Sequence, residues 1–337
     1  MLNAKIQKYF NPVTSVLSSH KFIPGNMAAN GVEVACNLCK KTQAEVPQPL
    51  KRCAKCRKAL YCSQDCQQTD WPSHKRLCIS KAEEEATSAG NYLLRAQLRP
   101  GEIESPAIWR TLSCPAVATF GRLHKALQIA FGWATTHEYD FTIKDPSYAP
   151  EDDEDDVAAM IQRFTATFHR GQQSQTAPRQ NLLRILAKSQ DRMGAFGAVD
   201  NMYSGMRSHP RTPEQSSNQT KLYKVLENSK YRGNDLEYEY DFGDCWTHKI
   251  SVIGRTEHSN IFVCTDGEGH PCAEDAGGAK GWNDLVEAYR TVSPTDDQCE
   301  KKEWFETICS NRDQGGLAGD RVKQWDKRLV NRLLAQI

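Results

Sequence analysis

The sequence predicts an α+β protein: a small two-zinc finger followed by a compact α+β domain with an antiparallel sheet and flanking helices. Two observations predict it. Seven cysteines and one histidine fall in four close pairs between residues 36 and 78. From residue 92 onward, short stretches of alternating apolar residues are mixed with helical apolar stripes. Alternation indicates strands with one buried face, and the stripes indicate helices that cover a sheet.

Length and charge narrow the classes of function. The 337 residues can build one large domain or two of ordinary size. The formal net charge of +1 gives no global field that would mark nucleic acid or a membrane as the partner. No apolar run reaches the roughly 20 residues of a membrane span. Residues 1–32 contain no acidic side chain and no secretory segment, so we expect a disordered tail rather than a targeting segment.

The four close pairs have the spacing of zinc ligands. They are Cys36-x2-Cys39, Cys53-x2-Cys56, Cys62-x3-Cys66 and His74-x3-Cys78. An x2 spacing suits a tight knuckle turn, and an x3 spacing places two ligands on one face of a helical turn. Eight such ligands make two closed tetrahedral sites. Because few apolar residues lie in this stretch, we expect two zinc ions to supply the folding free energy.

A disulfide scaffold is the alternative to zinc, and three features disfavour it. The chain has an odd total of 13 cysteines, the spacings are short, and a histidine occupies a ligand position. Six cysteines outside the pairs are dispersed without framework spacing: Cys114, Cys245, Cys264, Cys272, Cys299 and Cys309. Zinc thiolates and free thiols indicate a reducing compartment, so we expect cytoplasmic or nuclear residence.

The last part of the finger is predicted to be a helix with Ser63 as its N-cap. It would carry five residues of interest: Cys66, Gln67, Trp71, His74 and Cys78. The eight ligand positions, together with Tyr61-Cys62-Ser63, Cys66-Gln67, Trp71 and His74-Lys75, resemble a MYND finger.

The MYND resemblance has two implications. The ligands would interleave, with one ion on Cys36, Cys39, Cys62 and Cys66 and the other on Cys53, Cys56, His74 and Cys78. Ser63, Gln67 and Trp71 would line a shallow groove for short proline-containing peptides. A simpler role for Trp71 is to shield the zinc site, and one tryptophan can do both.

Two other functions of a zinc finger are disfavoured. Residues 40–78 contain nine lysines or arginines and three acidic residues, and the zinc-bound thiolates reduce this excess to about +3. The basic residues mostly lie between ligand pairs rather than along a recognition helix, so base-specific reading of DNA is not expected.

MYND fingers also accompany SET methyltransferase domains, but the Asn-His-Ser/Cys element and the post-SET cysteine cluster are missing here.

The second domain is predicted to begin after a polar linker at residues 79–91. The expected elements are a strand at 92–98, a helix at 119–131 capped by Thr119 and Gly132, a strand at 139–143, a short helix at 222–226, a hairpin at 236–252 turning near Gly243-Asp244, a strand at 261–264 and helices at 283–290, 302–309 and 320–334. Residues 145–220 are expected to form a flexible insertion with a short helix at 182–186. The domain would span residues 92–300, followed by C-terminal helices at 301–337.

Three sequence blocks of this domain jointly resemble the plasmid pRiA4b ORF-three-like family, also described as insertion-element passenger or TnpR-like proteins. The blocks are Ile108-Trp109-Arg110 with residues 119–137, the run from Tyr240 to His248, and residues 271–282. The resemblance implies a compact α+β domain and no established activity.

A second site is conceivable in these blocks. If the polar residues of these blocks converge, they could bind a divalent ion or perform acid–base chemistry. These residues are His124, His137, Asp241, Asp244, His248, Glu274 and Asp275. The candidate site consists of His137, Asp241, Asp244 and His248. The same residues also suit turns and cross-strand packing, and no recognisable catalytic or nucleotide motif occurs. We therefore expect a zinc-binding adaptor for protein partners. The alternatives are an uncharacterised enzyme recruited by the finger and a nucleic-acid factor.

Overall fold

The structure, a computed structural model, describes residues 34–148, 179–187, 204–205 and 207–337. It divides into two compact units, residues 1–80 and residues 81–337, each of which is treated by itself. The tail expected at residues 1–32 lies outside the described residues, as do residues 149–178 and 188–203 of the expected insertion. Within the described ranges, no helix combines the length and the apolar character needed to cross a membrane.

The first unit contains little regular structure and a very small core. It consists of a 3-10 turn, η1 (Gln43–Glu45), a two-stranded antiparallel ribbon of β1 (Lys51–Arg52) and β2 (Leu60–Tyr61), and one helix, α1 (Gln64–His74). Its buried cluster is Cys36, Cys53, Cys56, Tyr61 and Cys78. Four of these five residues are predicted zinc ligands, as expected for a module that metal rather than apolar packing stabilises.

Helix α1 begins where the sequence predicts and ends earlier. The Ser63 hydroxyl accepts a hydrogen bond from the Cys66 amide at 3.1 Å, which confirms the N-cap. The helix ends at His74, so the prediction that it carries Cys78 is wrong. The Leu77 amide donates to the His74 carbonyl in a turn. This turn takes Cys78 off the helix and places it beside Cys53 and Cys56, which lie between β1 and β2.

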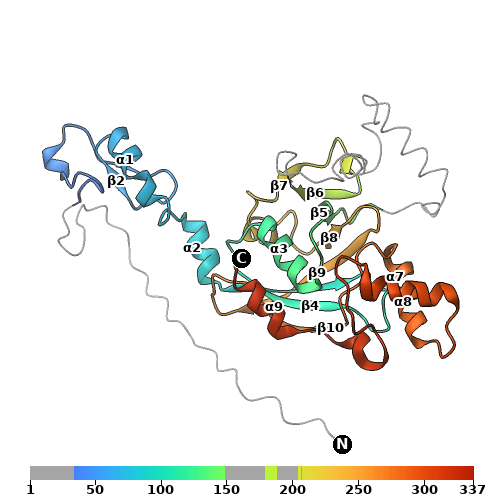
Figure 1. Cartoon of the computed structure of the whole chain (residues 1–337). Coiled ribbons are helices and arrows are strands. Elements are labelled where there is room, and N and C mark those ends of the chain that lie inside the picture. Colours follow the sequence, from blue (N-terminus) through green and yellow to red (C-terminus); the bar gives the residue numbers. More distant parts are fainter. Residues whose placement is uncertain (1–33, 149–178, 188–203, 206) are drawn as a thin grey trace, which may run out of the picture. The chain divides into compact units, whose positions relative to one another are not determined.

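The second unit is built on one eight-stranded sheet in the order β10-β4-β3-β9-β8-β5-β6-β7 (Figure 1). The strands are β3 (Asn91–Leu98), β4 (Trp109–Cys114), β5 (Tyr139–Lys144), β6 (Asn181–Leu186), β7 (Glu214–Ser216), β8 (Leu236–Tyr240), β9 (Trp246–Thr256) and β10 (Val263–Glu268). Neighbouring strands are antiparallel, except that β6 and β7 at one end are parallel. The predicted antiparallel sheet is therefore confirmed with one exception, and so is the hairpin of β8 and β9.

Part of the predicted flexible insertion belongs to the sheet. Residues 182–186, expected to form a helix, lie in β6, which pairs with β5 over most of its length, and residues 214–216 form β7. The apolar run of β6 has no clear periodicity, and both of its faces are buried. Such a run does not distinguish a buried strand from a buried helix, and pairing with β5 decides the outcome.

The described helices of the second unit are α2 (Lys81–Ser88), α3 (Phe120–Phe131), α6 (Leu222–Leu226), α7 (Gly278–Arg290), α8 (Asp296–Thr307) and α9 (Lys327–Leu334), with a 3-10 turn η3 (Gly319–Lys323). Helix α3 has the predicted caps, because the Thr119 hydroxyl accepts from the Arg122 amide and Gly132 adopts a left-handed conformation. Helix α3 packs on β4, and α9 packs on both α3 and β10 (Figure 1).

Five boundaries differ from the predictions. The helix expected at 302–309 lies at 296–307 and begins at the Thr295 cap. The expected linker contains a separate helix, α2, which belongs to the second unit. The strand expected at 261–264 lies at 263–268, and the helix expected at 283–290 begins at Gly278. The helix expected at 320–334 is divided, because Asp326 accepts hydrogen bonds from the Arg328 and Leu329 amides and starts a new helix there. In the new helix Val330 and Leu334 face the core and are buried, whereas Leu329 and Leu333 are exposed.

Candidate metal centres and peptide surface

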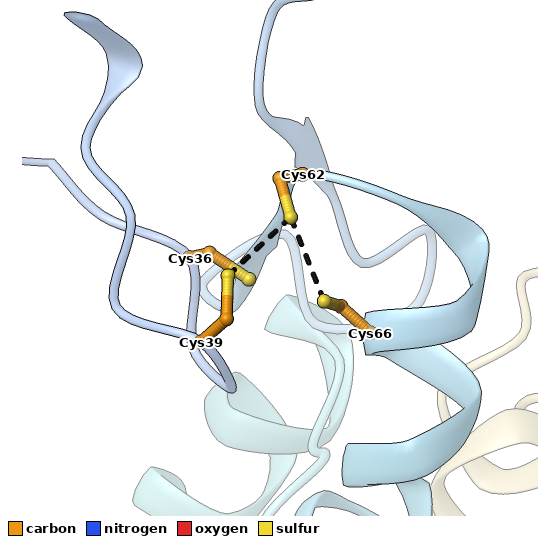
Figure 2. A group of neighbouring side chains, drawn as sticks. All are labelled: Cys36, Cys39, Cys62 and Cys66. Carbon is orange, nitrogen blue, oxygen red and sulfur yellow. Dashed lines mark hydrogen bonds between the residues drawn. The ribbon is translucent and has the colours of Figure 1, made fainter. Parts of the chain in front are cut away.

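The first metal centre joins a knuckle turn to the ribbon and the helix (Figure 2). Cys36 and Cys39 lie on the knuckle, Cys62 follows β2, and Cys66 lies in the first turn of α1. The Cys62 sulfur is 3.5 Å from the sulfur of Cys39 and 3.5 Å from that of Cys66. All four sulfurs lie within 4.8 Å of one another.

The second metal centre has a similar plan. Cys53 and Cys56 lie on a second knuckle, His74 is the last residue of α1, and Cys78 follows it. The Cys53 and Cys78 sulfurs are 3.7 Å apart, and the Cys56 sulfur is 3.5 Å from His74 Nε2. All four residues of this centre are buried.

Both sets of ligands fit a zinc ion. Zinc–sulfur bonds of about 2.3 Å in a tetrahedron separate the sulfurs by roughly 3.8 Å, close to the distances in both centres. All 13 cysteines are free thiols. The side chains gather as Cys36, Cys39, Cys62 and Cys66 in one group and Cys53, Cys56, His74 and Cys78 in the other, the same interleaved grouping that the resemblance implies. Each centre has four protein ligands, and zinc there is structural because no coordination position remains for a substrate.

The two knuckles share one backbone conformation. Lys40 and Arg57, each the residue after the second cysteine of its pair, have φ angles of 63° and 55°. Their amides donate to the carbonyls of Cys36 and Cys53 at 3.0 and 2.9 Å. Such turns also direct amides at the sulfurs. Burial raises the pKa of Cys36, but hydrogen bonds from the amides of Cys62, Cys39 and Leu38 outweigh it and lower the pKa to about 6. The knuckle therefore favours the thiolate that zinc requires.

Asp70 is a structural residue of the finger that the sequence did not reveal. Its Oδ2 accepts from Asn37 Nδ2 at 2.5 Å and from the Tyr61 hydroxyl at 2.7 Å. Asp70 thereby ties α1 both to the first knuckle and to β2. An aspartate on the polar face of a short helix gives no sequence signal that distinguishes it from a solvated charge.

The three residues predicted to line the peptide groove lie along one side of α1. Ser63, Gln67 and Trp71 are spaced by four residues, so their side chains share a face. Ser63 is exposed, Gln67 is half-buried, and the Trp71 side chain is 40% exposed. The Trp71 ring lies 6.0 Å from the ring of the ligand His74. Trp71 is thus in contact with the metal centre and with solvent.

In the second unit, the structure brings together only some of the predicted polar residues. His137 Nε2 is 3.7 Å from Asp241 Oδ2 and 3.0 Å from Asp275 Oδ1. Asp275 is one of the polar residues of the three sequence blocks whose convergence is considered above, although it is outside the four-residue candidate site. Asp244 does not belong to this group of ligand atoms, and its Oδ2 accepts from the Gly277 amide at 3.0 Å.

His248 lies in the core and is not part of that group. It is fully buried against Phe131, and its Nδ1 faces the carbonyls of Trp246 and Tyr238 at 2.9 and 3.3 Å. Burial lowers the pKa of His248 to about 3. A neutral histidine that donates to main-chain carbonyls supports cross-strand packing, so His248 does not share a site with His137 and Asp241.

Sequence comparison identifies the finger. The MYND finger model matches residues 36–78. SET domain-containing protein 14 of Caenorhabditis elegans is 40% identical over 73 residues, which are 22% of this chain and 16% of that protein. The chain therefore spans less than a fifth of the length of that relative. A MYND finger is a zinc-binding protein-interaction module.

Comparison of the rest of the chain gives a second family. The model of the plasmid pRiA4b ORF-3-like protein matches residues 92–314, beyond the boundary predicted at residue 300. The uncharacterized protein y4hQ of Sinorhizobium fredii is 25% identical over 222 residues, which are 64% of this chain and 80% of that protein. A crystal structure of a protein of unknown function, MM3350 from Methanosarcina mazei Go1, aligns with a TM-score of 0.42 and 21% identity over 70% of this chain and 95% of that one. The chain belongs to the plasmid pRiA4b ORF-3-like family and carries a MYND finger ahead of that domain.

Proposed function

We propose that this protein is a cytoplasmic or nuclear adaptor whose finger docks short proline-containing peptides of a protein partner. The observation that carries the proposal is the exposed Trp71 ring on a helix that the metal centres hold in place. Apolar rings exposed on a rigid support are suited to binding another chain. The domain at residues 92–314 then serves a second partner.

The chemistry of the predicted groove suits a proline-containing ligand. A proline-rich segment is extended before it binds, so it loses little conformational entropy, and its rings pack on aromatic side chains. The Gln67 amide can both donate to and accept from a peptide backbone. Ser63 lies one helical turn before Gln67, and its hydroxyl already accepts from the Cys66 amide.

An array of proline-containing peptides, with proline-to-alanine counterparts, tests the proposal on the full chain. We expect capture by the wild type to be lost when Gln67 and Trp71 are both replaced by Ala. Two zinc ions per chain should remain, because neither residue is a ligand. Gln68→Ala is the matched control, since Gln68 is exposed on the same helix but on a different face. Unchanged capture by the double variant would contradict the proposal.

Salt dependence separates peptide docking from a nucleic-acid role. Contacts to an aromatic groove depend weakly on ionic strength, whereas binding to phosphates weakens steeply because counterions are released. We expect the captured peptides to remain bound at high salt.

A further inference from the structure

The second unit contains a group of metal-ligating atoms that the finger does not use. Nε2 of His137, a carboxylate oxygen of Asp241 and a carboxylate oxygen of Asp275 all lie within 4.8 Å of one another. We propose that these three side chains hold one divalent metal ion, separate from the two zinc ions of the finger.

The distances suit a common coordination sphere. Metal–nitrogen and metal–oxygen bonds of about 2.1 Å separate adjacent ligands by roughly 3.0 Å in an octahedron and 3.4 Å in a tetrahedron. His137 Nε2 is 3.0 Å from Asp275 Oδ1 and 3.7 Å from Asp241 Oδ2. Small rotations of the carboxylates would place all three atoms around one ion.

The sheet fixes two of the ligands relative to each other. His137 lies two residues before the first residue of β5 and Asp241 immediately follows β8, and these strands pair with Tyr139 opposite Tyr240. The Asp241 amide extends the ladder by donating to the Glu138 carbonyl at 3.0 Å. The two ligands therefore emerge from neighbouring strand ends on a rigid scaffold, which a metal site requires.

A buried carboxylate fixes the loop of the third ligand. Glu274, next to Asp275, is fully buried, accepts from the Ala134 amide at 2.6 Å and also accepts from the Tyr240 hydroxyl. The Glu274 amide in turn donates to Asn311 Oδ1 at 2.8 Å. These bonds anchor the loop from both sides, so that Asp275 is held beside His137 while its own side chain is 56% exposed.

The charge of the group favours a cation. Within the described ranges, Asp241 and Asp275 form ion pairs with His137 and with no lysine or arginine, whereas Asp140 and Asp145 each pair with arginine. Asp241 is only 5% exposed, so water solvates its charge poorly. A buried carboxylate whose charged partner is a histidine, rather than a lysine or arginine, is stabilised by a bound metal ion.

The set of donors selects the class of metal. One imidazole with two carboxylates suits Mn²⁺, Fe²⁺ or Zn²⁺, whereas Ca²⁺ prefers six to eight oxygens. Three protein ligands leave coordination positions open, unlike the closed centres of the finger. The exposed Asp275 places those positions at the surface, where water or a small anionic ligand can complete the sphere.

Metal uptake by the full-length, zinc-loaded protein tests the site. Mn²⁺ is titrated and its free concentration followed by electron paramagnetic resonance, and a parallel titration with Zn²⁺ counts ions beyond two per chain. Mn²⁺ is a suitable probe because thiolate centres select zinc. We expect one further ion per chain. Asp275→Asn should weaken its binding by more than about 10-fold, since even the outer-shell partners of a metal contribute 10- to 100-fold. Asp241→Asn should abolish it.

Asp313→Asn is the matched control. Asp313 Oδ2 lies 3.0 Å from His270 Nε2, and among the described residues no second carboxylate pairs with that histidine, so this change should leave uptake unchanged. Asp275 is exposed, and its variant should therefore fold, which thermal unfolding checks. A wild-type protein that takes up neither ion beyond its two zinc ions would overturn the proposal. Further uptake that Asp275→Asn and Asp241→Asn leave unchanged would overturn it as well.

Discussion

The two units bury different kinds of side chain. In the finger, four of the five residues in the buried cluster are cysteines at ligand positions. In the second unit, large apolar side chains such as Phe120, Phe131 and Phe141 are buried between the sheet and its helices. In the finger, zinc binding thus supplies the folding free energy that apolar burial supplies in the second unit. The finger therefore depends on a metal for its fold, while the second unit depends on packing and on a few buried polar groups.

Removal of one zinc ligand should give the largest effect. Cys53→Ser removes a buried thiolate from the second centre, and we expect the zinc content to fall below two per chain and the finger to unfold. The free energy at stake is on the order of 10 kcal/mol, the scale of structural zinc binding. Metal analysis and circular dichroism measure both changes. Cys299→Ser, which alters an exposed cysteine outside the finger, should leave zinc content intact.

A buried ion cluster should give the next largest effect, confined to the second unit. Asp140 is fully buried and accepts from Arg184 Nε at 2.7 Å and from Arg207 Nε at 2.9 Å. Burial opposes its charge, but the two arginines lower the pKa of Asp140. Asp140→Asn removes the buried carboxylate that both arginines share and leaves Arg184 paired with Glu214 and Arg207 with Glu239. We expect a loss of about 3 kcal/mol in the free energy of unfolding, the lower end of the range for a broken buried ion pair.

Denaturant unfolding followed by tryptophan fluorescence measures that loss, because six of the seven tryptophans lie in the second unit. Asp320→Asn is the control. Its partner Lys323 is 3.0 Å away and both side chains are exposed, so we expect a change below about 1 kcal/mol. A similar loss in both variants would show that the burial of Asp140 has no energetic consequence.

Acid should destabilise the second unit through its buried histidines. Burial lowers the pKa of both His248 and His124 to about 3, whereas the unfolded chain binds protons near its usual value of about 6.5. Below that pH the unfolded state binds more protons, so the free energy of unfolding falls as pH falls. At pH 5 the loss is about 2 kcal/mol for each histidine.

Unfolding curves of the second unit between neutral pH and pH 5 check this dependence. His248→Gln removes one of the two groups and should reduce the slope by about half. The matched change His258→Gln, at an exposed position, should leave the slope as it is. A wild-type slope of zero would contradict a neutral, buried His248.

The smallest expected effect is on one helix cap. Thr119 caps α3 through its hydroxyl, and Thr119→Ala should lower the free energy of unfolding of the second unit by about 1 kcal/mol. Thr119→Ser keeps the hydroxyl and should restore most of the loss. Thermal unfolding of the two variants measures the difference, and equal stability would show that the cap contributes nothing.

Local chemistry made much of the fold predictable. Ligand spacing identified the two metal centres because each zinc ion restricts where its ligands lie along the chain. Caps and periodicity identified α3, since Thr119 and Gly132 mark its ends and its apolar stripe faces the core. The hairpin of β8 and β9 followed from alternation around Gly243.

Long-range contacts were not predictable in the same way. Arg184 interrupts an apolar run, and its burial in β6 depends on Asp140, a residue of the neighbouring strand β5. His248 was placed in a polar site although its side chain faces the core. Asp275 joined His137 through a loop whose course depends on Glu274. Each of these contacts joins distant segments and leaves no periodic signal in the sequence.

Hydrogen–deuterium exchange of the full-length protein, before and after a zinc chelator, tests the central claim most directly. We predict that chelation abolishes protection of the amides between residues 36 and 78 and leaves protection of β3, β4 and β9 unchanged, because apolar packing stabilises those strands. Loss of protection in both units together, or retained protection of the finger without zinc, would contradict a molecule in which metal folds one unit and packing folds the other.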